Sequence, residues 1–129
     1  MTGILLDTHA WVWSMIDVAR LSGPARTAIE TSPIVYVSPV SFFEIGQKAR
    51  LGKWPEIAPF GRRLPDLLHE QGGIVAPFTP EICIEASLME WQHRDPFDRL
   101  LAATARTLDI PLVSTDTAFA EVPTLRRLW

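Results

Sequence analysis

Four carboxylate side chains stand where an expected strand or helix meets a loop: Asp7, Glu44, Asp98 and Asp116. Although they are far apart in sequence, they can meet at one edge of a parallel sheet. Like charges raise each other's pKa, so such a cluster stays ionised at neutral pH only when a cation holds it. Because the donors are all oxygen atoms, a hard divalent ion, Mg²⁺ or Mn²⁺, is the first hypothesis.

Such an all-oxygen site suits hydrolysis of a phosphodiester. A bound divalent cation makes water more acidic and stabilises charge on phosphoryl oxygens, so no protein nucleophile is required. A phosphate-binding loop, a GxSxG elbow and zinc-finger spacing are all absent from the sequence. A phosphotransferase using Asp7 would carry a second aspartate where this chain has His9. His9 either orients a water or packs beneath the strand end, and His93 is expected to hydrogen-bond near the turn at Asp95.

The acids can meet only if the elements between them form a layered fold. Short apolar runs predict buried strands at 4–6, 34–37, 74–76 and 112–114, with a fifth strand as an option at 125–128. Capping residues, prolines and periodicity predict helices at 8–16, 22–31, 38–51, 60–70, 79–92 and 95–108, with Pro65 bending or shortening the fourth. Alternating strands and helices predict an α/β fold in which helices cover both faces of a parallel sheet.

Each acid also has a purely structural explanation. Asp7 can cap the helix that follows it, Asp98 suits the first turn of a helix, and Asp116 can cap a turn. Glu44 can pair with Lys48 one helical turn later. Taken jointly, the metal hypothesis gains weight, because Asp7 ends an apolar strand and Glu44 lies between two apolar residues. A buried carboxylate needs a partner.

Basic and aromatic groups near these acids suit a flexible RNA strand. Lys48 and Trp54 lie around the end of the Glu44 helix, where phosphate contacts and one stacking ring would serve a single strand. The alternative is a solvated helix end whose indole packs on the core. Arg99 either touches a substrate phosphate or pairs with Asp95.

The composition is that of an ordinary globular protein, and we expect a single domain over residues 1–129. Apolar residues make up 47% and charged residues 21% of the chain. The net charge is −3, and setting the four acids aside leaves +1, so an RNA substrate is neither favoured nor excluded. The single Cys83, the absence of a signal sequence and the absence of a long apolar run predict a cytoplasmic protein that does not enter a membrane.

Four blocks of the sequence together resemble the PIN-domain family, and within it the VapC-type toxins of type II toxin–antitoxin systems. They are residues 5–9 (LLDTH), 37–48 (VSPVSFFEIGQK), 93–103 (HRDPFDRLLAA) and 112–116 (LVSTD). The resemblance implies a PIN-like three-layer α/β/α sandwich with a five-stranded parallel sheet. It further implies a ribonuclease that depends on Mg²⁺ or Mn²⁺, a homodimer, and a cognate antitoxin that blocks the site.

The same resemblance carries site roles onto matching residues. It implies that Asp7, Glu44, Asp98 and Asp116 form the acidic catalytic and metal-binding site. Asp95 is either a helix cap or a ligand that reaches the metal through water, and Thr115 would help to hold substrate or a water.

Two other functions remain open from the sequence. One is an acidic pocket that receives a basic partner segment without catalysis, which would not require Mn²⁺ binding. The other is a PIN nuclease that processes DNA or structured RNA and has no antitoxin. A small open reading frame next to the gene would favour the toxin over this second alternative.

Overall fold

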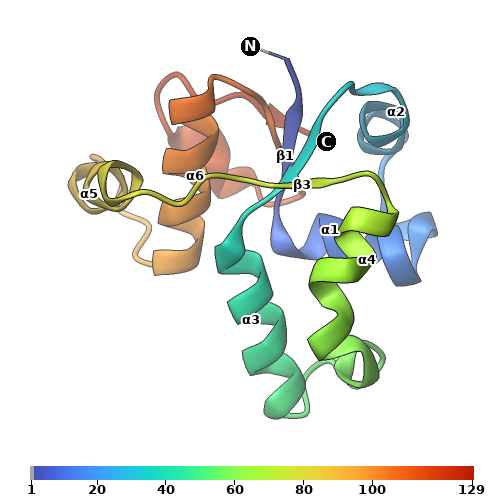
Figure 1. Ribbon diagram of the computed structural model, residues 1–129. Helices are drawn as coiled ribbons and strands as arrows, with labels where there is room; N and C mark the ends of the chain where they lie inside the picture. Colours follow the sequence, from blue (N-terminus) through green and yellow to red (C-terminus); the bar gives the residue numbers. More distant parts are fainter. Residues whose placement is uncertain (1) are drawn as a thin grey trace.

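The computed structural model describes residues 2–129, and its centre is a sheet of five parallel strands (Figure 1). The strand order is β3-β2-β1-β4-β5. The strands are β1 (Ile4–Leu6), β2 (Val35–Val37), β3 (Ile74–Val75), β4 (Leu112–Val113) and β5 (Arg127–Leu128). The five-stranded parallel sheet expected from the sequence is therefore confirmed, including the strand near the C-terminus.

Helical segments connect every pair of successive strands. The α-helices are α1 (Thr8–Ile16), α2 (Gly23–Thr31), α3 (Pro39–Arg50), α4 (Leu64–Glu70), α5 (Pro80–Leu88) and α6 (Pro96–Leu108). Three 3₁₀ segments accompany them: η1 (Val18–Arg20), η2 (Ala58–Arg63) and η3 (Thr117–Glu121). No helix within residues 2–129 is both long enough and apolar enough to cross a bilayer.

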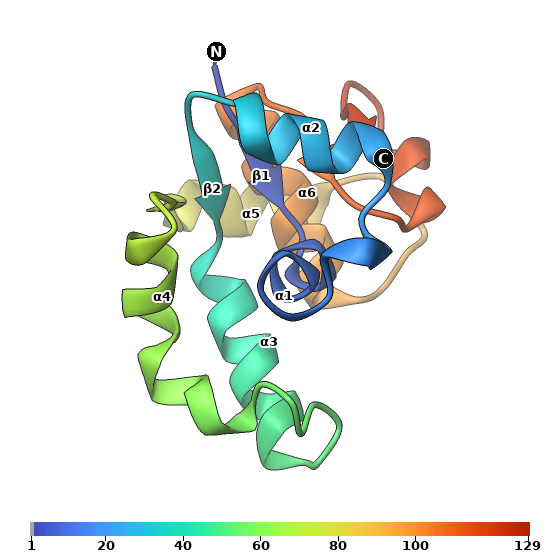
Figure 2. The same ribbon diagram turned by 90° about the vertical axis from the view of Figure 1, so that its right-hand side faces the viewer.

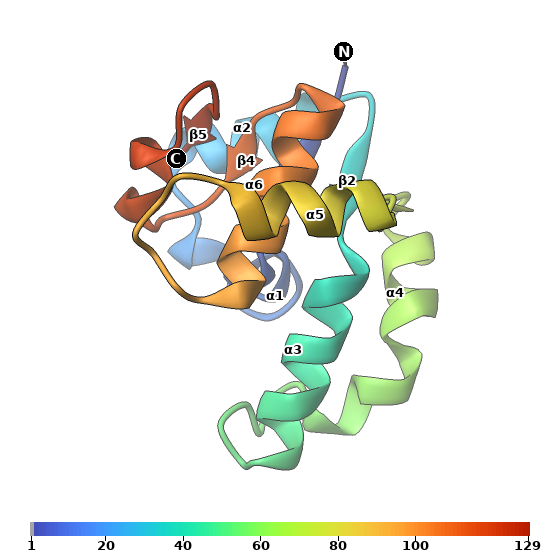
Figure 3. The same cartoon turned by 90° about the vertical axis from the view of Figure 1, so that its left-hand side faces the viewer.

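Alternate residues of the central strand, β1, belong to two separate apolar cores. Ile4 and Leu6 pack with α1, α2, α3 and α4 on one face of the sheet, whereas Leu5 packs with α5 and α6 on the other. All three residues are at least 95% buried, as a strand covered on both faces requires. The two helical layers lie on opposite sides of the strands in Figures 1 and 3. The three-layer α/β/α arrangement is confirmed.

Side-chain caps set where the helices begin. Asp7, Ser22, Ser38, Thr79 and Asp95 each accept a hydrogen bond from a main-chain N–H in the first turn of the following helix. Four of these helices also have proline at the first or second position, where no intrahelical hydrogen bond is lost. The capping signals in the sequence therefore predicted the helix starts closely.

Two predicted helices differ from the structure. The helix expected over 60–70 is split at Leu64 into η2 and α4, because Pro65 cannot continue the hydrogen-bonding pattern from the preceding turn. The pair formed by α3 and α4 extends away from the sheet in Figure 2. The helix expected to reach Gln92 ends at Leu88, because the carbonyls of Met89 and Trp91 accept hydrogen bonds from a distant side chain, Arg99.

The strand order places a switch point between β1 and β4. From β1 the chain moves outward through β2 to β3, and it then returns to place β4 on the other side of β1. Helices that leave the two sides of such a point diverge, which opens a crevice beyond the carboxyl ends of the strands. Asp7 follows β1, and Asp116 lies three residues after β4.

Candidate metal centre

A pocket of about 570 Å³ lies at this switch point, and all four predicted acids line it. Asp7 comes from the end of β1, Glu44 from α3, Asp98 from the first turn of α6, and Asp116 from the start of η3. Asp95, which either caps a helix or reaches the metal through water, lines the same pocket. The fold thus gathers carboxylates from residues 7 to 116 into one cavity.

Asp7 is the most enclosed of these acids. The residue is 7% exposed, and one carboxylate oxygen accepts a 2.7 Å hydrogen bond from the main-chain N–H of Ala10. Burial raises the pKa of Asp7, and the nearby charge of Asp98 raises it further. Hydrogen bonds from Ser114 and Ala10 and the proximity of His9 lower the pKa but do not offset burial. The surroundings of Asp7 therefore do not supply enough positive charge or hydrogen bonding to stabilise its ionised form.

Asp98 is half-buried, and its pKa is also raised above the ordinary value. Burial raises its pKa, and the charges of Asp95 and Asp116 add to the rise. His93 opposes it, because its Nε2 atom lies 2.7 Å from Oδ2 of Asp98. Since Asp98 also contributes to the raised pKa of Asp7, the acids of this pocket repel one another across it.

Glu44 is held by two partners. The hydroxyl of Thr8 donates a 2.6 Å hydrogen bond to Oε1, and Nζ of Lys48 lies 3.0 Å from Oε2. The helical ion pair that the sequence allowed is therefore formed. Thr8 also lies 2.9 Å from the buried hydroxyl of Ser41. Sequence reasoning did not single out Thr8, although its place directly after Asp7 was a signal.

Asp116 and Asp95 are exposed and cap short turns with one oxygen each. Oδ1 of Asp116 accepts from the N–H of Ala118 at 2.9 Å, and Oδ1 of Asp95 accepts from the N–H groups of Phe97 and Asp98. The capping roles that the sequence offered as alternatives are thus real. They leave the second carboxylate oxygen of each residue available, so capping and metal binding are compatible at these positions.

The donor set fits a divalent cation. His93, Asp98 and Asp116 each offer one ligand atom, and these three atoms lie within 4.8 Å of one another. A shared cation would stabilise the ionised forms of Asp7 and Asp98, whose pKa values are raised in its absence. Sequence reasoning gave His93 only a hydrogen bond near the Asp95 turn. Its place in this group could not be read from the sequence, because it depends on the path of the loop before α6.

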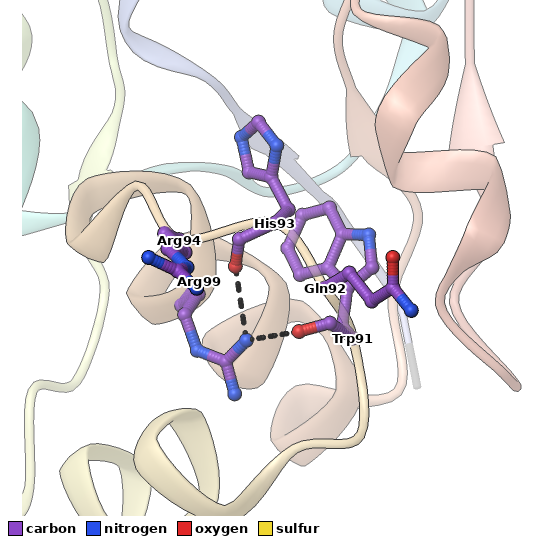
Figure 4. A pocket seen from close by; sticks show the side chains of 5 residues that line it. All are labelled: Trp91, Gln92, His93, Arg94 and Arg99. Atoms are coloured by element: carbon purple, nitrogen blue, oxygen red, sulfur yellow. Dashed lines mark hydrogen bonds between the residues drawn. The ribbon is translucent and has the colours of Figure 1, made fainter.

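Of the residues predicted to contact substrate, Lys48 and Thr115 line the pocket, and Arg99 does not. Arg99 lines a neighbouring cavity of about 620 Å³, where its guanidinium binds main-chain carbonyls (Figure 4). No ion pair with Asp95 is found in residues 2–129, so neither role offered for Arg99 is seen in its contacts. The guanidinium N–H groups of Arg99 donate to main-chain carbonyls of the protein, not to a site that faces the acidic pocket.

Three aromatic rings form a group at one rim of the acidic pocket: His9 and Trp13 line the pocket, and Trp54, which packs against the core, lies next to His9. The ring of His9 lies 5.6 Å from that of Trp13 and 5.0 Å from that of Trp54, and Nζ of Lys48 lies 4.9 Å from the Trp54 ring. Arg20 lies over Trp13 at 5.5 Å. Sequence reasoning placed Trp54 beside Lys48 but did not predict that His9 and Trp13 would join them.

A parallel five-stranded sheet with acids gathered at its switch point is the arrangement expected for a PIN domain. The family model of the PIN domain matches residues 4–125, and the chain belongs to that family. Ribonuclease VapC22 of Mycobacterium tuberculosis is 32% identical to it over 117 residues, which cover 90% of this chain and 88% of that protein.

Solved structures share the fold at lower identity. VapBC2 from Rickettsia felis, bound to a DNA fragment from its promoter, aligns with a TM-score of 0.72 and 14% identity over 97% of this chain and 96% of that one. DNA-bound VapBC from Salmonella typhimurium aligns with a TM-score of 0.70 and 14% identity, covering 98% and 97% of the two chains. These likenesses extend over nearly the whole of both chains.

Proposed function

We propose that this protein is a metal-dependent endoribonuclease and the toxin of a toxin–antitoxin pair. The observation that carries the proposal is the convergence of Asp7, Glu44, Asp98 and Asp116 on one pocket at the switch point of the sheet. Membership of the PIN domain family and similarity to a protein named as a ribonuclease support it. The pKa values of Asp7 and Asp98 are raised by burial and by neighbouring carboxylates, so a bound cation would stabilise their ionised forms.

In this proposal Asp7 and Asp98 bind the cation directly, and Glu44 and Asp116 complete the site directly or through water. A bound Mg²⁺ or Mn²⁺ would lower the pKa of water and neutralise charge on the scissile phosphate. Thr8 and Lys48 fix the carboxylate of Glu44 from two sides. Either Glu44 or Asp116 then accepts the proton of the attacking water, and no residue forms a covalent bond to the substrate.

Lys48, Thr115 and the aromatic rim are the proposed substrate contacts. Lys48 lies between Glu44 and the Trp54 ring, so its ammonium group can pair with the Glu44 carboxylate and also contact an incoming phosphate. The rings of His9, Trp13 and Trp54 offer stacking surfaces that tolerate any base. An unpaired strand fits such a rim better than a duplex, whose bases are already stacked.

The toxin role brings further expectations. We propose a homodimer that acts on RNA in the cytoplasm and is inhibited by a cognate antitoxin. The named relatives support this assignment, since the solved neighbours include a toxin–antitoxin complex from Klebsiella pneumoniae, which aligns with a TM-score of 0.64 and 18% identity.

The test is incubation of the purified chain with total cellular RNA, with and without EDTA, followed by mapping of the RNA ends. Cleavage should require a divalent cation and should be lost in Asp7→Asn and Asp98→Asn. The matched control is Asp66→Asn, which changes an exposed aspartate in the first turn of α4. Full cleavage by both site variants would overturn the proposal, and failure to bind Mn²⁺ in calorimetry would favour a non-catalytic binding pocket.

A further inference from the structure

His93 lines the neighbouring cavity and meets the acidic pocket through Asp98, which lines that pocket. Its Nε2 atom lies 2.7 Å from Oδ2 of Asp98, and the indole of Trp91 stacks on its ring with centroids 4.7 Å apart and planes inclined by 27°. Its main-chain carbonyl accepts a hydrogen bond from Arg99 at 3.0 Å (Figure 4). The imidazole therefore has a defined orientation, although its own segment is neither helix nor strand.

Arg99 supplies the anchor for that segment. Nε donates to the carbonyl of Ala86 at 2.8 Å, and Nη1 donates to Trp91 at 2.7 Å and to His93. Nη2 donates to Met89 as well. One guanidinium thus binds both the end of α5 and the loop before α6. It can do so because its five N–H donors are held in a rigid planar arrangement. Because Arg99 follows Asp98 in α6, the same helical turn carries an acid of the pocket and the anchor of the histidine.

The donors gathered in this way are not all oxygen. A nitrogen of His93 and carboxylate oxygens of Asp98 and Asp116 lie within 4.8 Å of one another. Mg²⁺ strongly prefers oxygen ligands, whereas transition-metal ions accept imidazole readily. A site with one imidazole therefore discriminates between divalent ions in a way that carboxylates alone do not.

We propose that His93 is a nitrogen ligand of the cation held by Asp98 and Asp116, and that the site consequently prefers Mn²⁺ to Mg²⁺. Arg99 is the positioning residue that keeps His93 in place. This inference rests on the proposed function, because it assumes that a divalent cation occupies the acidic pocket. It goes further by naming a non-carboxylate ligand and the ion that this ligand selects.

Pulsed electron paramagnetic resonance of bound Mn²⁺ provides the decisive readout, since a directly bound imidazole gives a nitrogen coupling. The chain has three histidines, so His9→Gln, His69→Gln and His93→Gln can be compared one by one. We expect the coupling in the unaltered protein, in His9→Gln and in His69→Gln, and its loss in His93→Gln. Labelling the unaltered protein with ¹⁵N-histidine should change the coupling pattern, which tests the ligand without any mutation.

Calorimetry supplies a second readout. His93→Gln should weaken Mn²⁺ binding by about tenfold or more while changing Mg²⁺ binding much less. Arg99→Lys keeps the positive charge but cannot reach several carbonyls at once, so it should reduce the Mn²⁺ preference to an intermediate value. An unaltered ratio of Mn²⁺ to Mg²⁺ affinity in His93→Gln would overturn the inference.

The outcomes separate this inference from the proposed function. If the unaltered protein binds no Mn²⁺, the metal-dependent nuclease itself is contradicted. If Mn²⁺ binds and Asp98→Asn abolishes binding, but no nitrogen coupling is seen, the metal site stands and only the role of His93 is wrong.

Discussion

The hydroxyl of Thr8 donates a 2.6 Å hydrogen bond to Oε1 of Glu44, and this bond joins the start of α1 to the middle of α3. Thr8 directly follows Asp7, whose carboxylate caps α1. Two pocket acids that are 37 positions apart are therefore fixed relative to each other through one hydroxyl. The direction of the Glu44 carboxylate depends on Thr8 as well as on its own helix.

Thr8→Val keeps the shape of the side chain and removes this hydrogen bond. We expect the rate of RNA cleavage to fall by roughly tenfold, a loss of about 1.4 kcal/mol in transition-state stabilisation, because Glu44 is then held by Lys48 alone. The buried hydroxyl of Ser41 also loses its contact with Thr8, which should lower the free energy of unfolding by about 1–3 kcal/mol. Thr8→Ser retains the hydroxyl and is the control. Equal single-turnover rates for the valine and serine variants would contradict the role given to Thr8.

Asp7→Asn should stabilise the metal-free protein at neutral pH. Because burial raises the pKa of Asp7, the folded protein binds a proton more tightly than the unfolded chain does. The free energy of unfolding therefore falls as the pH rises from the ordinary aspartate value, about 3.9, to the raised pKa. Above that window the cost of burying the charge is fully present. Asparagine carries no charge and can still cap α1.

The measurement is thermal unfolding in EDTA at a series of pH values. At neutral pH the Tm of Asp7→Asn should exceed that of the unaltered protein by several degrees, and the difference should disappear in acid, where Asp7 is protonated. Asp66→Asn, at an exposed site, should show no such pattern. A lower Tm for Asp7→Asn at neutral pH would show that burial of this charge is not a net cost.

Divalent cations should stabilise the folded protein through the same acids. Ligand that binds only the folded state adds about 2.7 kcal/mol when its free concentration is 100 times the Kd. We expect Mn²⁺ to raise the Tm in a concentration-dependent manner and EDTA to reverse the rise. In Asp98→Asn the response should be lost. A Tm that is independent of Mn²⁺ up to millimolar concentrations would argue against a metal centre.

Lys48→Met should weaken RNA binding while leaving the fold intact. Lys48 lies beside both Glu44 and the Trp54 ring, so its replacement removes the proposed phosphate contact and leaves Thr8 as the remaining partner of the Glu44 carboxylate. Fluorescence anisotropy with a labelled single-stranded RNA, in an Asp98→Asn background that does not cut, should give a larger Kd. The slope of log K against log salt concentration should fall by about 0.7.

Lys53→Met is the matched control, because Lys53 is exposed and does not line the pocket. If both methionine variants weaken binding equally, Lys48 contributes only general positive charge. If neither weakens binding, the RNA does not pass over this rim.

Local signals in the sequence predicted most of the fold. Ile4-Leu5-Leu6 is apolar without alternation, which is what a strand covered on both faces requires, and Asp95 and Pro96 defined the start of α6. Proline rules also indicated that Pro65 disturbs the helix expected over 60–70, although not that the segment divides into η2 and α4. These features depend on neighbouring residues, so they can be read along the chain.

The parts that could not be predicted depend on contacts between distant residues. The helix α5 ends four residues earlier than expected because Arg99 draws the carbonyls after Leu88 away from a helical path. His93 reaches Asp98 only because that loop is held in this way. The acids themselves were predicted from their places at the ends of elements, whereas the aromatic rim required the three-dimensional positions of His9, Trp13 and Trp54.

The order of the strands also bears on synthesis of the protein. β1 lies at the centre of the sheet, yet its neighbour β4 and the pocket residue Asp116 come from the last fifth of the chain. Domains emerge from the ribosome N-terminus first. A nascent polypeptide from which residue 116 has not yet emerged therefore holds an incomplete pocket, and all the acids that line this pocket are present together only near the end of synthesis.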